Sequence, residues 1–183
     1  MKLLTNGCSF TAHSPYPTWP YLLGTDRVKN LAQHAAGNQW ICDSTIAELS
    51  ENTYDLVLVM WSGLSRLDFI VEEGFYHSIN GVKSVNNFGI HYLHNEQEQF
   101  KSLSAVMGER DRVFNSLIRI LSLQSYLKVR NIDYRFMSFM NFWEDVCGYG
   151  FDYLLEQIDF DSWIFSNGCK DGLFELSQEN NLY

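Results

Sequence analysis

A Gly-x-Ser triplet close to the amino terminus is the feature of this sequence that most directly suggests chemistry. Gly7, Cys8 and Ser9 follow an apolar run that breaks at Asn6. A buried strand that enters a tight turn here leaves the serine hydroxyl at the carboxyl end of the strand, where open α/β sheets bind ligands. A serine held on such a turn faces the substrate and acts as a nucleophile in hydrolases. A turn serine that merely caps the following segment is the alternative interpretation of Ser9.

Two further loops follow predicted strands and are expected to meet this turn. Residues 36–38 read Ala-Gly-Asn, and residues 61–66 read Trp-Ser-Gly-Leu-Ser-Arg. In a doubly wound sheet, such loops converge on one crevice. The N–H groups of Ser9 and Gly37 are candidate donors for a developing oxyanion, because a glycine lets the backbone approach the substrate closely.

These segments resemble the sequence blocks of the SGNH (GDSL-type) hydrolases. Residues 7–9 resemble the Gly-Asp-Ser turn of the first block, with Cys8 in place of the aspartate, and Gly37 resembles the glycine of the second block. The third block, Gly-x-Asn-Asp, falls on residues 63–66, which read Gly-Leu-Ser-Arg. The resemblance therefore implies that Ser65 replaces the asparagine of the family's oxyanion hole.

The resemblance implies a serine esterase that acts on an acetyl or similar ester of a small molecule or carbohydrate. Ser9 would attack the acyl carbon and form an acyl-enzyme, while Gly37 and Ser65 would help to hold the oxyanion. No cofactor and no metal ion are expected. The residues expected to contact the substrate are Cys8, Asn38, Ser62, Gly63 and Arg66.

The catalytic base that the resemblance requires is not found in this sequence. The family carries Asp-x-x-His near its carboxyl terminus, and no histidine follows His94 here. Either the pair lies in a tail beyond Tyr183, or the domain is a catalytically inactive binding or interaction module. The departures at Ser65 and Arg66 favour the second alternative.

Other polar residues have ordinary structural interpretations. His91 and His94 have a spacing that suits a metal ion, but no third ligand is evident. Arg66 fits a substrate carboxylate or phosphate and fits an ion pair with Asp68 equally well. The four cysteines show no metal-binding spacing, so reduced thiols are expected, and Cys8 is interpreted as a small buried apolar residue.

The composition excludes several classes of partner. The 183 residues carry a net charge of −9, which disfavours a nucleic-acid partner because phosphate binding requires a basic patch. No apolar run reaches the roughly 18 residues of a membrane span, and the amino terminus lacks the pattern of a signal peptide. A cytoplasmic protein without membrane contact is expected.

The hydrophobic periodicity predicts one α/β domain over residues 1–183. Expected strands cover 2–5, 28–32, 55–61 and 133–140, and expected helices cover 17–23, 39–50, 110–130 and 151–158. Their alternation is typical of a three-layer α/β/α sandwich around a flavodoxin-like parallel sheet, the fold that the SGNH resemblance also implies. The helix over 110–130 is expected to have an apolar face of Val113, Leu117 and Leu121, with Phe114 and Ile118 beside them.

Residues 66–108 differ from their surroundings and are interpreted as an insertion or lid over the edge of the sheet. The segment is polar with scattered aromatic residues, and it contains the dipeptide Asn80-Gly81. This dipeptide predicts a type I′ hairpin that pairs residues 76–78 with 82–85. The aromatic residues of the insertion would provide the contact surface if the protein served in assembly.

Overall fold

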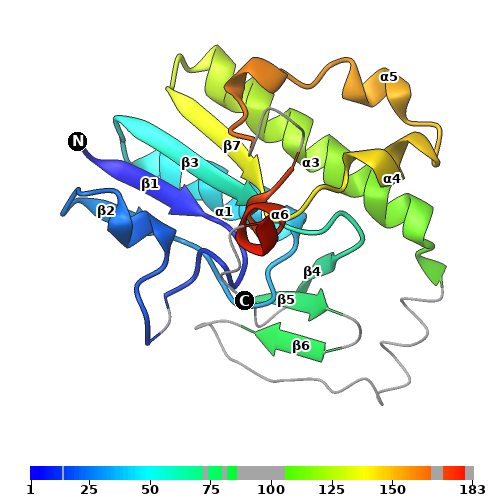
Figure 1. Ribbon diagram of the computed structural model, residues 1–183, viewed down its shortest axis with the longest axis horizontal. Coiled ribbons are helices and arrows are strands. Elements are labelled where there is room, and N and C mark those ends of the chain that lie inside the picture. Colours follow the sequence, from blue (N-terminus) through cyan, green and yellow to red (C-terminus); the bar gives the residue numbers. More distant parts are fainter. Residues whose placement is uncertain (14, 72–73, 80–81, 86–105, 166–170, 180–183) are drawn as a thin grey trace.

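The structure is a computed structural model in which four parallel strands form the central sheet (Figure 1). It describes residues 1–183 except 14, 72–73, 80–81, 86–105, 166–170 and 180–183. The strand order is β2-β1-β3-β7. The four strands are β1 (Leu3–Asn6), β2 (Val28–Asn30), β3 (Leu56–Trp61) and β7 (Tyr134–Ser138).

The central strand β3 shows why this sheet forms. All six of its residues are apolar, and the five from Val57 to Trp61 are buried. Side chains alternate between the two faces of a strand, so a continuous apolar run suits a strand that is covered on both sides. The predicted strand over 55–61 is confirmed.

Two long helices cover one face of the sheet. The helices α1 (Asn38–Glu51) and α3 (Glu109–Val129) pack against each other and lie behind the sheet in the view of Figure 1. The buried stripe of α3 includes Val113, Leu117, Ile120 and Leu127, whereas Phe114 is exposed. Leu121, expected on the apolar face, is half-buried because the stripe continues through Ile120 and Leu123 instead.

Shorter segments lie on the opposite face. A 3-10 helix (Trp19–Leu22) lies within the helix expected over 17–23. Trp19, Met137 and residues of α6 (Leu173–Glu179) line one small cavity, so these segments share the Met137 face of the sheet. The protein is thus an α/β protein with a parallel four-stranded sheet flanked by helices. The remaining short helices are α4 (Trp143–Cys147), α5 (Asp152–Leu155) and a 3-10 helix (Phe160–Ser162).

The insertion forms a second, antiparallel sheet. Its strands are β4 (Leu67–Val71), β5 (Gly74–Ile79) and β6 (Val82–Val85), in the order β4-β5-β6. Ile79 pairs with Val82, which confirms the predicted hairpin, although its turn at 80–81 lies outside the described residues. Strand β4 was not expected from the sequence, and it contacts α1. Residues 86–105 of the predicted lid lie outside the described residues.

Candidate functional site

The Gly7-Cys8-Ser9 turn lies at the carboxyl end of β1, between β2 and β3. The chain leaves β1 toward β2 on one side, and β3 lies on the other, so this edge is the topological switch point of the sheet. The Cys8 carbonyl accepts hydrogen bonds from the N–H groups of Thr11 and Ala12, both at 2.9 Å. Ser9 therefore stands at the start of a single helical turn that follows a strand.

Ser9 is half-buried, and its polar groups are available. Within the part of the chain that the structure describes, neither its hydroxyl nor its N–H has a hydrogen-bond partner. Cys8 beneath it is fully buried and carries a free thiol, in line with its interpretation as a small apolar residue. The turn thus leaves one hydroxyl and one backbone N–H without a partner at the carboxyl edge of the sheet.

Only a glycine fits at position 7. A Cβ atom there would lie 2.9 Å from the Cβ of Thr11 and 3.0 Å from the carbonyl oxygen of Met60. Both distances are shorter than ordinary contacts, and one of the neighbours is backbone that cannot move away. The close approach of β1, β3 and the helical turn therefore depends on Gly7.

Asn6 holds this turn against α1. Its side-chain oxygen accepts a hydrogen bond from the N–H of Gly7 at 2.8 Å. Its amide nitrogen lies within hydrogen-bond distance of the Ile41 carbonyl, Ser44 Oγ and Thr45 Oγ1, at 3.0, 2.8 and 2.9 Å. Because Asn6 is fully buried, the amide is a structural link between the β1 exit and the middle of α1.

A carboxylate from the insertion caps the start of α1. The N-cap residue of this helix, Gly37, has no side chain that could accept a hydrogen bond. Asp68 of β4 takes this role: its two oxygens accept hydrogen bonds from the N–H groups of Gly37 and Trp40, at 2.9 and 2.8 Å. A Cβ at Gly37 would lie within 2.8 Å of that carboxylate, so any larger residue here would displace the cap. The Gly37 N–H that was expected to face an oxyanion donates to Asp68 in this structure.

Asn38 joins α1 to the end of β3. Its amide nitrogen donates to the Ser62 carbonyl at 3.1 Å, and its amide oxygen accepts from the Ser62 N–H at 2.9 Å. Asn38 is almost completely buried, as is Ser62, whose hydroxyl has no partner among the described residues. Both residues were expected to contact substrate. In the structure, the Asn38 amide and the Ser62 backbone are buried and bond each other, so these groups connect α1 to the end of β3.

The loop before α1 contains a strained residue that Arg66 helps to hold. Ala35 has a φ of 69°, in the left-handed region that disfavours residues with a Cβ. Arg66 donates from Nη1 to the carbonyl oxygen of the next residue, Ala36, at 3.0 Å. One guanidinium donor therefore stabilises the loop that leads to Gly37.

Replacing Ala35 by glycine is expected to raise the free energy of unfolding by about 1 kcal/mol, because glycine adopts this conformation without a steric penalty. Urea denaturation measures the change. The control is Ala47→Gly, at an exposed position inside α1, where glycine should lower stability by about 1 kcal/mol. Equal losses in both variants would show that Ala35 is not strained.

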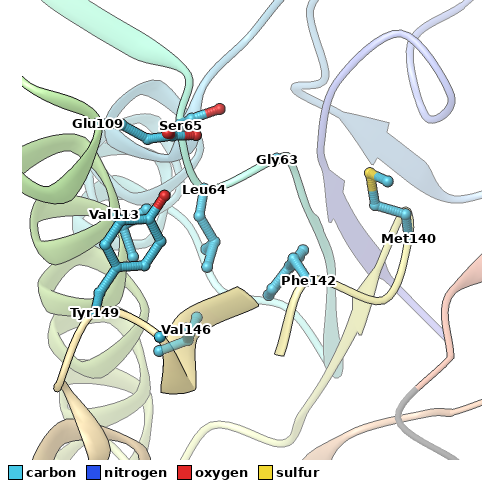
Figure 2. Close-up of a pocket in the computed structure, with 10 residues that line it drawn as sticks. Gly63, Leu64, Ser65, Glu109, Val113, Met140, Phe142, Val146 and Tyr149 are labelled. Carbon is cyan, nitrogen blue, oxygen red and sulfur yellow. The ribbon is translucent and has the colours of Figure 1, made fainter. Parts of the chain in front are cut away.

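A cavity of about 460 Å³ opens between the exits of β3 and β7 (Figure 2). Gly63, Leu64 and Ser65 follow β3 and line one side, while Met140 and Phe142 follow β7 and line another. The remaining lining residues are Glu109 and Val113 of α3, Val146 of α4, Gly148 and Tyr149. Ser65, expected to replace the oxyanion-hole asparagine, is exposed at this cavity.

The cavity and the Ser9 turn lie at the same edge of the sheet. Phe10, the residue after Ser9, stacks on Phe139 with ring centroids 3.9 Å apart. Phe139 directly precedes Met140, which lines the cavity. The stacked rings hold the β1 exit and the β7 exit together, so the turn and the cavity occupy the same carboxyl edge of the sheet.

Most of the candidate residues lie together, and two residues that were not candidates support them. The structure brings the 7–9 turn, Gly37, Asn38, Ser62 and Gly63 to one edge of the sheet. Asp68 and Asn6 are the supporting residues whose roles the sequence did not reveal, since the groups that they bond at Gly37 and in α1 lie more than 25 residues away along the chain. His91 and His94 lie outside the described residues.

The fold and the site define an α/β protein that presents a Gly-x-Ser turn at the switch point of a parallel sheet. The chain belongs to DUF6071, a family of unknown function whose sequence model matches residues 11–174. Neither the curated proteins nor the solved structures contain a match to it. Among the described residues, no cluster of three His, Cys, Asp or Glu side chains suits a metal ion, and no helix is long and apolar enough to cross a membrane.

Proposed function

We propose that this domain is a serine hydrolase of the SGNH type that cleaves an ester through an acyl-enzyme on Ser9. The supporting observation is the geometry of the 7–9 turn: a half-buried serine with an unengaged hydroxyl and N–H at the switch point of a parallel sheet. The proposal includes a three-layer α/β/α arrangement, with the segment 10–27 and α6 as the third layer. The proposed substrate is an ester of a small molecule or carbohydrate, and the proposed location is the cytoplasm, as expected from the sequence.

The reaction would follow the sequence of steps common to serine hydrolases. Ser9 Oγ attacks the acyl carbon while its proton passes to a base, and the alcohol leaves with that proton. Water then attacks the acyl-serine and releases the acid. The N–H of Ser9 is the available oxyanion donor, and the N–H of Gly37 joins it only where the Asp68 carboxylate releases its hydrogen bond.

The base in this proposal comes from outside the described residues. Of the histidines whose side chains are described, His34 is exposed, and His13 packs edge-on against Tyr21 with ring centroids 5.7 Å apart. A base must reach the serine proton directly or through one water. Neither ring is hydrogen-bonded to Ser9, so we assign the role to neither of them.

A binding module with the same crevice is the second candidate function. The observation that favours it is the Gly37 N–H, which an internal carboxylate already engages. A module of this kind would bind its ligand at the crevice without covalent chemistry, so the two functions differ in the reactivity of Ser9.

Intact-mass spectrometry of the natural full-length protein, before and after treatment with a fluorophosphonate probe, tests the proposal. One adduct is expected on the wild type and none on Ser9→Ala, because the probe reacts only with an activated serine. The matched control is Cys8→Ala, which removes the neighbouring nucleophile and should keep the adduct. Wild-type protein without an adduct would exclude the hydrolase and support the binding module.

Ester hydrolysis by Ser9→Ala is expected to fall by at least about 10³-fold, the order of loss seen when a catalytic nucleophile is removed. The measurement is kcat/KM on an activated ester, with Cys8→Ala as the reference for local packing changes. A Ser9→Ala protein with wild-type activity would contradict the assignment of the nucleophile.

A further inference from the structure

The geometry points to a binding site for an uncharged, apolar group in the cavity between the β3 and β7 exits, and so to ester substrates that carry a hydrocarbon or aromatic group larger than acetyl. The second half of this statement rests on the proposed function, whereas the binding does not require Ser9. The cavity volume of about 460 Å³ lies within the range of roughly 300–1,000 Å³ that small-molecule sites occupy.

The floor of the cavity is apolar and rigidly held. Leu64, Val113, Phe142 and Val146 line it, and all four are buried members of the main hydrophobic core. They come from the β3 exit, α3, the β7 exit and α4, so four separate parts of the fold shape the surface. An apolar ligand that enters would remove its own surface from water. Because these side chains are already ordered, binding would not carry the entropic cost of ordering them.

The rim of the cavity is polar and carries negative charge. Figure 2 shows Ser65 and Glu109 at one end of the pocket, with the Tyr149 hydroxyl directed toward that end and Val146 at the other. Glu109 is exposed in the first turn of α3, where the helix dipole favours a carboxylate. Together with the net charge of −9, this carboxylate disfavours an anionic ligand.

The cavity lies at the same edge of the sheet as Ser9, and this makes it relevant to substrate choice. The Phe10–Phe139 stack holds the segment after Ser9 against the segment that leads to Met140. A substrate that reacts at Ser9 and extends along this edge past the β3 exit would place its apolar group in the cavity. Each methylene that becomes buried there should raise affinity about fourfold.

The first experiment measures binding in the Ser9→Ala background, so that no turnover is needed. The probe is N-phenyl-1-naphthylamine, a neutral apolar fluorophore. Val146→Phe fills the cavity from its floor, and Ser65→Trp obstructs its exposed rim without disturbing the core; each should weaken binding at least tenfold. The control is Val129→Trp, at the exposed last residue of α3, which should bind as the parent does.

Charge is tested with a second probe. Glu109→Gln should leave the neutral probe unaffected and strengthen binding of the anionic 1-anilinonaphthalene-8-sulfonate about threefold, the order expected for one exposed charge. Neutral binding that survives both Val146→Phe and Ser65→Trp would overturn the assignment of the cavity.

The ester series separates this inference from the proposed function. The wild-type kcat/KM should rise about fifteenfold from p-nitrophenyl acetate to the butyrate, which has two more methylenes, and Val146→Phe should abolish that rise. Probe binding at the cavity without any ester hydrolysis would remove the proposed function and leave the binding site. If acetate is the preferred ester and neither cavity variant changes probe binding, the cavity site would be removed and the proposed function would be kept.

Discussion

Asp68→Ala is expected to lower the free energy of unfolding by about 3 kcal/mol, measured by urea denaturation. Asp68 is only 5% exposed, and its carboxylate accepts the N–H groups of Gly37 and Trp40. Alanine removes the cap of α1 and leaves two donors without a partner at a mostly buried helix end. Hydrogen bonds to a charged group are worth about 1.5–3 kcal/mol each, and loss of a helix cap alone costs about 1 kcal/mol.

A control on the same helix shows why burial decides the size of this effect. Asp43 of α1 pairs with Arg119 of α3 at 2.8 Å, but the two side chains are 25% and 36% exposed. Asp43→Ala should therefore cost less than about 1 kcal/mol. Asp68→Asn should lie between the two, because its amide keeps one acceptor for one of the two N–H groups. If Asp68→Ala cost no more than Asp43→Ala, the carboxylate would not cap α1.

The second large effect is expected for Asn6→Ala, which should also lower the free energy of unfolding by about 3 kcal/mol. This fully buried amide bonds the Gly7 N–H and three oxygen atoms of α1. Its removal takes the partner of the buried Gly7 N–H, breaks the link to α1 and opens a cavity beside the Ser9 turn. Ser44→Ala removes only one of these contacts, at a half-buried position, and should cost less than about 1 kcal/mol.

The variant Asn6→Asp tests the same contacts through pH. A carboxylate cannot donate to the Ile41 carbonyl, and burial raises the pKa of a carboxyl group. A group whose pKa is higher in the folded state than in the unfolded state stabilises the fold least at high pH. The difference from wild type should therefore grow as the pH rises from 4 to 8. A difference that is independent of pH would contradict the buried position of this side chain.

Most elements of the central sheet were predictable because their signals are local. The unbroken apolar run of β3, the proline pattern beside Thr18 and the dipeptide Asn80-Gly81 each act within a few residues. The expected helix over 151–158 shows the limit of this approach, since α5 ends at Leu155. Beyond it, Gln124 of α3 accepts the Asp159 N–H and donates to the Gln157 carbonyl. These tertiary hydrogen bonds engage the backbone just beyond α5.

The order of apolar and turn-forming residues alone thus placed Ser9, Gly37 and the 61–66 loop at strand ends, because strand formation and turn chemistry are local. Only the tertiary structure decided what those groups bond to. Asp68 reaches Gly37 across 31 residues, and Asn38 reaches Ser62 across 24. Hydrogen bonds of this kind depend on how separate elements pack, and the cavity depends on side chains from four of them. Sequence spacing carries no measure of that packing, so the occupied Gly37 donor and the cavity between the β3 and β7 exits emerge only once the chain is folded.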